Sequence, residues 1–223
     1  MLVRKTPSNE FIAALIGATF AALVLYGWGV YRNHSFYYGY LTWNLFLAWL
    51  PLLFATWLMR LLRTKLWSDW IPLGVSILWV LFLPNSFYLI SDFIHLNNVP
   101  TVDVLFDTVM FSAFIYTGVL IGITSVYLVH RELRKRLTAV TSAVLIAGTL
   151  LVSSFAIYIG RDLRWNSWDV VTNPGGLLFD ISDRILHPSA YHQMFVTTIS
   201  FFILLGSMYV LAYNGVKALQ KLR

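Results

Sequence analysis

The sequence predicts an all-α membrane protein, a polytopic bundle of six transmembrane helices that forms one integral membrane domain over residues 1–223. Its residues are 58% hydrophobic and 12% charged, whereas charged residues make up about a quarter of a soluble domain. The apolar residues form continuous runs without the alternation that marks strands. The net charge is +6, but the Lys and Arg residues lie beside these runs, as residues that fix membrane topology do. The positive charge is therefore explained without a nucleic-acid partner, and none is expected.

The apolar runs define the expected spans. A spanning helix needs about 20 apolar residues, and the runs lie at about 11–31, 41–59, 70–93, 104–129, 138–160 and 192–213. The first run follows Arg4 and Lys5, as the apolar core of a signal peptide would. It is longer than such a core, and no small-residue cleavage site follows it. We therefore expect a retained span, with removal as a signal peptide as the alternative.

The distribution of charge predicts which loops lie on which side of the membrane. Twelve of the 16 Lys and Arg residues flank one set of span ends: Arg4, Lys5, Arg60, Arg63, Lys65, Arg131, Arg134, Lys135, Arg136, Lys217, Lys221 and Arg223. Positive residues mark cytoplasmic loops, so both termini are expected in the cytoplasm. The other flanks hold most of the acidic residues and histidines, and they are expected on the outer side of the cell membrane.

The expected outer loop at 161–191 is long enough to hold structure of its own. Its segment 173–176, Asn-Pro-Gly-Gly, is a turn signal. Four apolar residues that follow fall on one helical face, and three charged residues fall on the other: Leu177, Leu178, Ile181 and Ile185, against Asp180, Asp183 and Arg184. This pattern predicts a short amphipathic helix on the membrane surface, either a lid or a simple closure of the bundle.

Small residues and prolines mark positions of helix packing. Gly118-x3-Gly122 and Gly17-x3-Ala21 would let helices approach closely, either within the monomer or between two copies. Pro51 and Pro84 lie inside spans, where each is expected to bend the helix or free a backbone carbonyl.

The third span carries a polar stripe. Asn85, Tyr88, Asp92 and His95 are spaced 3, 4 and 3 apart, which places them within about 80° of one another on an α-helix. Ser91 lies four residues before His95, so its hydroxyl could approach the same edge. Because ionisable residues that face lipid are costly, this stripe is expected to face the bundle interior. The alternative is that Asp92 and His95 mark the water boundary.

Other elements are expected to bring polar residues to the same level. Asn44 and Asp107 lie about one turn inside the second and fourth spans. Arg161 and Arg164 end the fifth span, and His192 opens the sixth. Together with the stripe they predict a site in the outer leaflet.

The segment after the fifth span has the composition of an anion-binding site. Arg161 and Arg164 are three apart, and Trp165, Asn166 and Asp169 follow them. Guanidinium groups bind phosphate and carboxylate bidentately, so these residues are expected to bind substrate together with Asn44. The alternative is that the two arginines pair with acidic residues and lock the bundle.

A zinc site is a further possibility from the residue types. Asp92, His95 and His192 could hold a zinc ion with an open position, with His187 as a more doubtful ligand. Their spacing does not match a standard helical metal motif, and hydrogen bonding is the alternative role for these histidines. The chain contains no cysteine, which excludes thiolate ligands and cysteine nucleophiles.

Two stretches carry a resemblance to a known family. FLPNSFYLISDFIHL at 82–96 and YIGRDLRWNSWD at 158–169, with Asn44 and its flanking aromatic residues, resemble an uncharacterised family of bacterial multi-span membrane proteins, domain-of-unknown-function family thirteen-sixty-one. The resemblance extends over most of the chain. It implies an integral location in a bacterial inner or plasma membrane, and it implies no activity.

A looser resemblance concerns mechanism. Ser91-x3-His95, then Asp107, then His187 and His192 look somewhat like the pattern of alkaline ceramidases and adiponectin-receptor-like membrane hydrolases. That resemblance implies zinc-activated hydrolysis of an amide in lipid. The chain departs from the pattern with six spans rather than seven, and its late histidines are five apart.

These residues favour three functions. The first is a membrane-embedded hydrolase or transferase for a lipid or lipid-linked envelope substrate that bears phosphate or carboxylate. Asp92 or Asp107 would be its base or metal ligand, His95 and His192 its acid–base groups or ligands, and Asn85 and Tyr88 further catalytic residues. The second is a transporter or a small-ligand or ion-binding protein. The third is a structural or accessory subunit. Confinement of the polar residues to the outer half of the membrane favours the first over the second.

Overall fold

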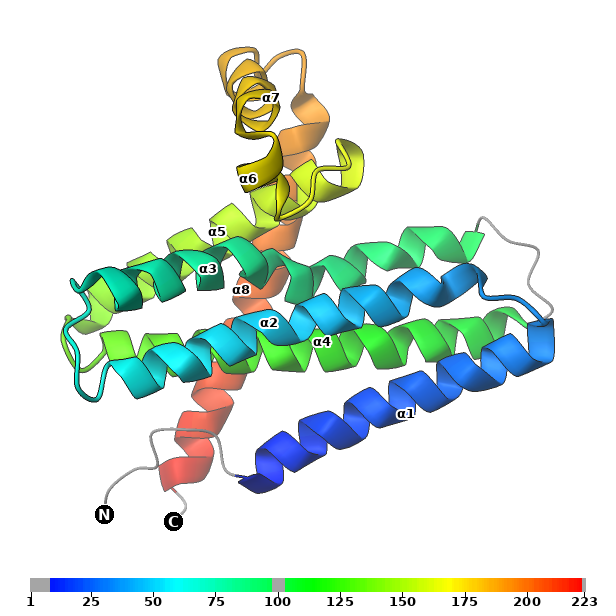
Figure 1. Cartoon of the computed structure of the whole chain (residues 1–223), viewed down its shortest axis with the longest axis horizontal. Coiled ribbons are helices and arrows are strands. Elements are labelled where there is room, and N and C mark those ends of the chain that lie inside the picture. Colours follow the sequence, from blue (N-terminus) through cyan, green and yellow to red (C-terminus); the bar gives the residue numbers. More distant parts are fainter. Residues whose placement is uncertain (1–8, 98–102, 222–223) are drawn as a thin grey trace. The chain divides into compact units, whose positions relative to one another are not determined.

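The structure, a computed structural model, describes residues 9–97 and 103–221, so Arg4, Lys5 and Arg223 lie outside the described residues. The elements are α1 (Asn9–Asn33), η1 (Tyr37–Gly39), α2 (Tyr40–Leu61), α3 (Trp70–Tyr88), η2 (Leu89–Asn97), α4 (Val104–Leu133), α5 (Ala139–Asp162), α6 (Asp169–Thr172), α7 (Pro174–Leu186) and α8 (His192–Lys221) (Figure 1). Six helical segments are long and apolar enough to cross a membrane, and the described residues form no strand. The predicted all-α fold with six spans is confirmed.

The chain divides into two compact units, residues 1–136 and 137–223. The first contains α1 to α4, and the second contains α5 to α8.

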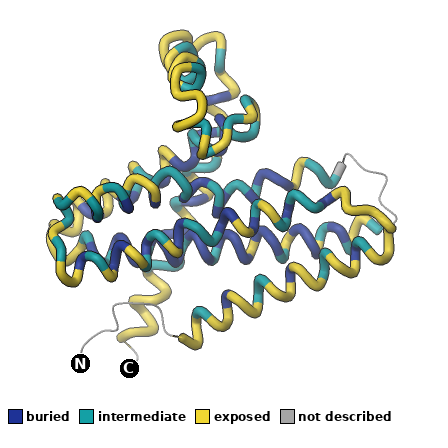
Figure 2. Tube along the Cα trace, in the orientation of Figure 1, coloured by how far each residue is buried: buried dark blue, intermediate teal, exposed yellow. Residues whose placement is uncertain are grey.

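In the first unit, α4 is the central helix. α1, α2 and α3 all contact it, and α2 also packs along α3 (Figure 1). α4 is largely buried, whereas most of α1 is exposed (Figure 2). The exposed side chains of α1 include Ile16, Phe20 and Trp28. Apolar residues on the outside of a bundle are what a lipid environment requires, since lipid solvates them as well as a protein core does.

Two glycines allow α4 to lie against α3. A Cβ at Gly122 would come within 2.8 Å of the Phe87 ring and of the Ser86 Cβ, and a Cβ at Gly118 would come within 2.9 Å of the Ser86 carbonyl oxygen. The Gly118-x3-Gly122 pattern therefore packs helices within the monomer. Gly17 makes no such contact within the monomer, because nothing lies within 4 Å of its Cβ position, and contact between two copies stays a prediction there.

Polar side chains also join the helices of the first unit. The Ser86 hydroxyl on α3 donates to the Ala48 carbonyl oxygen on α2 at 2.8 Å. The Trp79 indole donates to the Ser125 hydroxyl on α4 at 3.4 Å, and the Trp49 indole on α2 donates to Thr19 on α1 at 3.2 Å. These hydrogen bonds help to determine which faces of the helices meet, because apolar packing alone is not directional.

The third span changes its helical form near its end. α3 runs through Pro84 to Tyr88, and a 3₁₀ segment, η2, continues from Leu89. The Ser91 hydroxyl donates to the Tyr88 carbonyl oxygen at 2.6 Å. A serine that satisfies a carbonyl in this way competes with the α-helical ladder. In a 3₁₀-helix residues three apart are eclipsed, so Leu89, Asp92 and His95 form one row.

In the second unit, α5 and α8 pack against each other, and the segment 163–191 covers one end of this pair. We call this segment the cap. It holds α6 and α7, so the predicted helix of the long loop is present. A small core joins the cap to the two spans: Tyr158, Ile159 and Met194 are buried, and Leu163, Trp165, Leu177, Ile181 and Tyr191 pack against them.

Candidate functional site

The acidic side chain of the third span lies in the middle of the row formed by η2. Asp92 is 1% exposed. The Asn44 amide on α2 donates to Asp92 Oδ2 at 3.0 Å. A buried carboxylate is tolerated when hydrogen bonds satisfy it, and the amide of Asn44 is one such donor. The prediction that Asp92 faces the interior agrees with its burial, and Asn44 is its neighbour.

His95 lies one 3₁₀ turn beyond Asp92. Its ring is half-buried and meets the Tyr40 ring edge to face, with 5.3 Å between the ring centroids. Residues three apart on a 3₁₀-helix are separated by a rise of about 6 Å and point in the same direction. The structure therefore places a buried carboxylate one 3₁₀ turn before a partly exposed imidazole in the same row, and α2 supplies a neighbour to each.

A second buried carboxylate lies in the first turn of α4. Asp107 is 2% exposed, and the Tyr38 hydroxyl of η1 lies 3.4 Å from its Oδ2. Tyr38 is itself buried and packs edge to face on Phe111, with centroids 5.0 Å apart. Like Asp92, this carboxylate has a neutral donor from the segment at the start of the second span.

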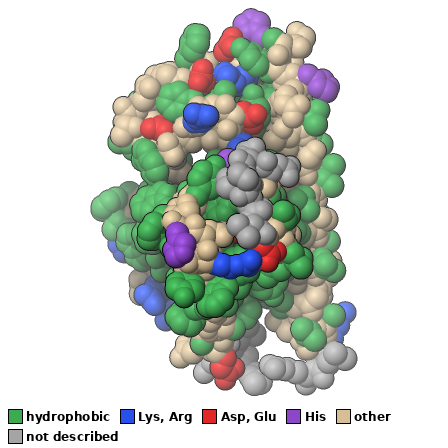
Figure 3. Space-filling view, turned by 90° about the vertical axis from the view of Figure 1, so that its right-hand side faces the viewer, with side chains coloured by type: hydrophobic (Ala, Val, Ile, Leu, Met, Phe, Trp, Pro, Cys, Tyr) green, Lys and Arg blue, Asp and Glu red, His purple; other side chains and the backbone are tan. Residues whose placement is uncertain are grey.

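An ion pair lies beside Asp107 at the end of the unit. Asp103 accepts from the Phe106 backbone N–H at 3.0 Å and from Arg32 at 3.1 Å. The Phe106 N–H, and then Arg32, hold the pKa of the Asp103 carboxyl below its usual range. Figure 3 shows this end of the unit, where a basic and an acidic side chain touch amid hydrophobic ones. Asp103 caps α4, so its charge has a structural use.

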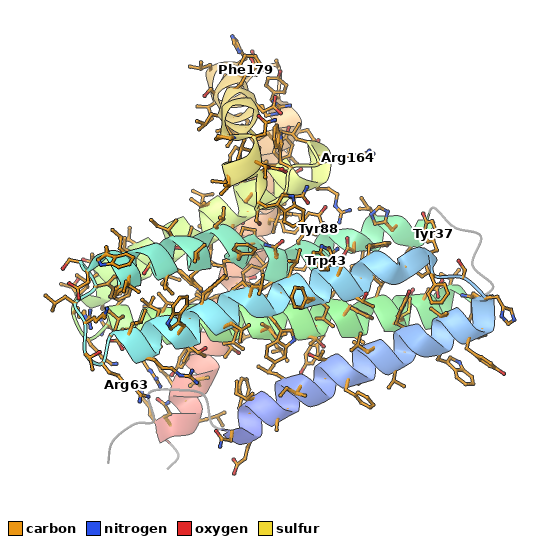
Figure 4. The ribbon with its side chains drawn as sticks, viewed as in Figure 1. Tyr37, Trp43, Arg63, Tyr88, Arg164 and Phe179 are labelled. Atoms are coloured by element: carbon orange, nitrogen blue, oxygen red, sulfur yellow. The ribbon has the colours of Figure 1, made fainter. Side chains whose placement is uncertain are left out.

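Asn85 and Tyr88 occupy the α-helical part of the predicted stripe. The Asn85 amide donates to the Phe82 carbonyl oxygen at 3.0 Å, within its own helix. The Tyr88 carbonyl accepts from Ser91, and the Tyr88 side chain is half-buried (Figure 4). A catalytic role for either residue stays a prediction.

The predicted substrate-binding residues after the fifth span belong to the second unit. The Trp165 indole donates to Asp180 Oδ2 on α7 at 2.7 Å. Asp169 accepts from the Asn166 backbone N–H at 2.6 Å and from Thr172 at 3.0 Å. The Asn166 N–H, followed by Thr172, lowers the pKa of the Asp169 carboxyl. These three residues therefore hold the cap together.

The two arginines differ in exposure. Arg164 is exposed, has φ of 62°, and projects from the loop before α6 (Figure 4). Left-handed backbone is uncommon for a residue with a side chain. Arg161 is half-buried at the end of α5. Anion binding by the pair stays a prediction, as does a single site shared by both units.

The sequence analysis missed one cluster of titratable residues in the cap. Asp183 Oδ1 lies 2.9 Å from His187 Nδ1, and the Tyr191 hydroxyl donates to Asp183 Oδ2 at 2.5 Å. Tyr191, with a further contribution from His187, lowers the pKa of Asp183, and the same bond raises the pKa of Tyr191. The Arg184 guanidinium lies 4.8 Å from the Tyr191 ring centroid. The spacing of four between Asp183 and His187 was the available signal.

The described residues of the two units contain no cluster of potential metal ligands. Among residues 9–97 and 103–221, no three His, Asp or Glu side chains lie close enough to hold a metal ion. The predicted zinc ligands Asp92 and His95 belong to the first unit, and His192 to the second. The zinc site therefore stays a prediction.

Comparison with known proteins identifies the family. No curated protein and no solved structure matches the chain. The family described as Protein of unknown function (DUF1361) matches residues 43–206, which include most of α2, all of α3 to α7 and the first half of α8. The matched range contains Asn44, Asp92, His95 and Asp107, together with the whole cap. The chain therefore belongs to the DUF1361 family, as its two most distinctive stretches predict.

Proposed function

We propose that this protein is a membrane-embedded hydrolase or transferase that acts on a lipid or lipid-linked envelope substrate at the outer face of a bacterial cell membrane. One observation carries the proposal. The buried Asp92 carboxylate accepts a hydrogen bond from Asn44 and lies one 3₁₀ turn before the half-exposed His95 in the chain, in the same row. An aspartate behind a histidine is a recurrent way to orient an imidazole for proton transfer.

Each residue of this pair has a distinct role. His95 takes the proton from the attacking water or hydroxyl group and returns it to the leaving group. Asp92 stabilises the imidazolium that forms between these steps. Asn44 holds the carboxylate in place through its hydrogen bond, and Tyr40 supports the imidazole ring. Asp92 and Asn44 are therefore positioning residues, and His95 is the catalytic residue.

The surroundings support a lipid substrate. Trp43, which precedes Asn44, is 52% exposed and stacks on the exposed Phe46, with 5.4 Å between ring centroids (Figure 4). Exposed aromatic residues at span ends favour the headgroup region of a bilayer. A lipid-linked substrate would reach such a site by lateral diffusion.

The test compares cells that lack the endogenous copy with cells that produce defined variants. Deletion should cause one lipid or lipid-linked intermediate to accumulate in mass spectra, and the wild type should clear it. Asp92→Asn and His95→Ala, at equal levels of folded protein, should convert it at least about 100-fold more slowly. Asp103→Asn is the matched control, because asparagine also caps helices. If both site variants cleared the intermediate as the wild type does, or if deletion changed no lipid, the proposal would fail.

A second candidate function is proton-coupled transport, and the Asp107–Tyr38 pair favours it. A carboxylate 2% exposed beside a buried phenol can bind a proton without exposure to bulk water. Wild-type protein in vesicles with an internal pH dye should then respond to an imposed proton gradient, and Asp107→Asn should not. Equal dye responses from vesicles with and without protein would reject this candidate.

A further inference from the structure

The charged side chains of α7 are bonded to other residues of the cap. Asp180 accepts from Trp165 at 2.7 Å, and Arg184 Nη1 donates to the Asp180 carbonyl oxygen at 2.9 Å. Asp183 accepts from Tyr191, over whose ring the Arg184 guanidinium lies. Leu177 and Ile181 pack beneath them on the core that joins the cap to the spans. The charged side of α7 therefore makes its contacts within the unit.

The opposite side of α7 is apolar and uncovered. Leu178, Phe179, Ile185 and Leu186 are 63%, 71%, 60% and 72% exposed. They fall within about 120° on the helix, and Ser182 is the only polar residue between them on this face. Figure 4 shows Phe179 on the side of α7 away from the rest of its unit. In α6, Val171 is 81% exposed. Such an apolar face is rarely left to water.

The position of this face in the fold indicates what covers it. Six residues, 163–168, separate α5 from α6, and five residues, 187–191, separate α7 from α8. The cap also packs directly on Tyr158, Ile159 and Met194 at the ends of α5 and α8. Because both helices are long and apolar enough to cross a membrane, a segment packed on their ends is expected at the boundary of the bilayer. The start of α8 is exposed and apolar as well, with Phe195, Val196 and Ile199.

Its chemistry favours lipid over a protein partner. A protein interface usually has a polar rim with hydrogen bonds. The exposed face of α7 has no charged residue, since Asp180, Asp183 and Arg184 are all engaged inside the cap. Acyl chains demand no hydrogen bonds, so they suit this surface.

We propose that the cap is a membrane-seated platform whose face of Leu178, Phe179, Ile185 and Leu186 enters the phospholipid layer. Interfacial helices bury their apolar face about 5–10 Å into the boundary of headgroups and acyl chains. This inference does not depend on the proposed enzyme activity. It also differs from the face expected from the sequence, because Leu177 and Ile181 belong to the core and not to the lipid contact.

The absence of cysteine from the chain makes a direct test available. Phe179→Cys, Ser182→Cys and Leu186→Cys, each with a nitroxide label, are made in the full-length protein in vesicles of phosphatidylcholine and phosphatidylglycerol. Electron paramagnetic resonance compares relaxation of the label by oxygen, which enters lipid, with relaxation by a water-soluble nickel chelate. Val144→Cys on α5, a residue 63% exposed, is the lipid control. Arg164→Cys is the water control.

Labels at 179, 182 and 186 should behave like the label at 144, with oxygen at least several-fold more effective than nickel. The label at 164 should show the reverse preference. Preference for nickel at the three cap positions would mean that the face is in water. Low accessibility to both reagents would mean that protein covers it. Either result would overturn the proposal, and three positions guard against disturbance of the cap by one label.

Discussion

At the scale of single residues, the first unit holds two buried aspartates, and each accepts a hydrogen bond from a neutral donor. Asn44 donates to Asp92, and Tyr38 to Asp107. Neutral donors stabilise a carboxylate without fixing its charge as firmly as Arg or Lys would. The transport candidate requires a group that can exchange a proton, and Asp107 would be that group. The basic partner at this end of the unit, Arg32, pairs with Asp103.

The bond between Asn44 and Asp92 should be measurable as stability. Asn44→Leu leaves a buried carboxylate with one donor fewer, so we expect the free energy of unfolding to fall by about 1–3 kcal/mol. Adding Asp92→Leu should cost less than the two single changes predict, since the double variant has no unsatisfied carboxylate. Unfolding in mixed detergent, followed by circular dichroism, measures both. Trp43→Leu, at an exposed neighbour, should change stability by no more than about 0.5 kcal/mol. Strict additivity would show that Asn44 and Asp92 do not interact.

The Asp183 cluster makes a prediction about pH. The pKa of the Asp183 carboxyl is lowered in the folded state, mainly by the hydrogen bond from the Tyr191 hydroxyl. The resulting stability is therefore complete above the unfolded pKa of about 3.9. It is lost as the pH falls through the folded value. Tyr191→Phe should raise the folded pKa of Asp183 and weaken the loss of thermal stability between about pH 5 and pH 3. Tyr116→Phe, at an exposed tyrosine, should keep the wild-type profile. Identical profiles for Tyr191→Phe and the wild type would contradict the assignment.

The sequence predicted part of the site at this scale. It identified Asp92 as an interior residue, because a carboxylate within an apolar span is expected to face protein. Helical phase alone could not show that the Asn85 amide bonds to its own helix, nor that the span becomes 3₁₀ after Tyr88. It also could not assign Trp165 to the cap, because that contact depends on where Asp180 lies after folding.

At the scale of elements, close contact of α3 and α4 positions the site. Gly122 lets the Phe87 ring and Ser86 lie against α4. Ser86 in turn donates to Ala48 on α2, the helix that carries Asn44. The glycine therefore brings three helices within reach of one another, and Asp92 meets Asn44 as a consequence.

Adding one methyl group at Gly122 should separate these helices. Its Cβ would meet Ser86 and Phe87 at 2.8 Å, so we expect Gly122→Ala to lower stability by about 1–3 kcal/mol. Gly74→Ala is the matched control, because Gly74 lies in the span helix α3 and its Cβ would meet nothing within 4 Å. That change should be neutral or stabilising, since alanine favours helix. Thermal unfolding of both variants in the same detergent measures this difference in stability. Equal stability of the two would mean that the contact is not tight.

Elements were more predictable than their faces. The expected spans agree with the observed helices to within a few residues over α2 to α5, because an apolar run of sufficient length has few alternatives. The expected helix after Asn173 is also present. Its apolar residues, however, divide between the cap core and the exposed side, with Leu177 and Ile181 in the first group and Leu178 and Ile185 in the second. Periodicity gives the positions of side chains around a helix but not the neighbour that covers them.

At the scale of the whole molecule, six helices that are long and apolar enough to cross a membrane and the asymmetry of basic residues together predict a topology. α3, α4 and α5 lie between Arg63 and Arg164, and each is long and apolar enough to cross a membrane. An odd number of crossings places the two loops on opposite sides. The excess of Lys and Arg beside Arg63 predicts that its loop is cytoplasmic.

Single cysteines at these two positions, both labelled in Figure 4, test this topology in living cells. A membrane-impermeant maleimide should label Arg164→Cys in intact cells, and it should label Arg63→Cys only after permeabilisation. The cysteine-free parent is the background control. Labelling of both positions from one side would mean that one of the three intervening helices does not cross. Exchanged accessibility would preserve the six crossings but reverse the orientation. The proposed active site and the cap would then face the cytoplasm, so a substrate at the outer surface would be excluded even if both sites were intact.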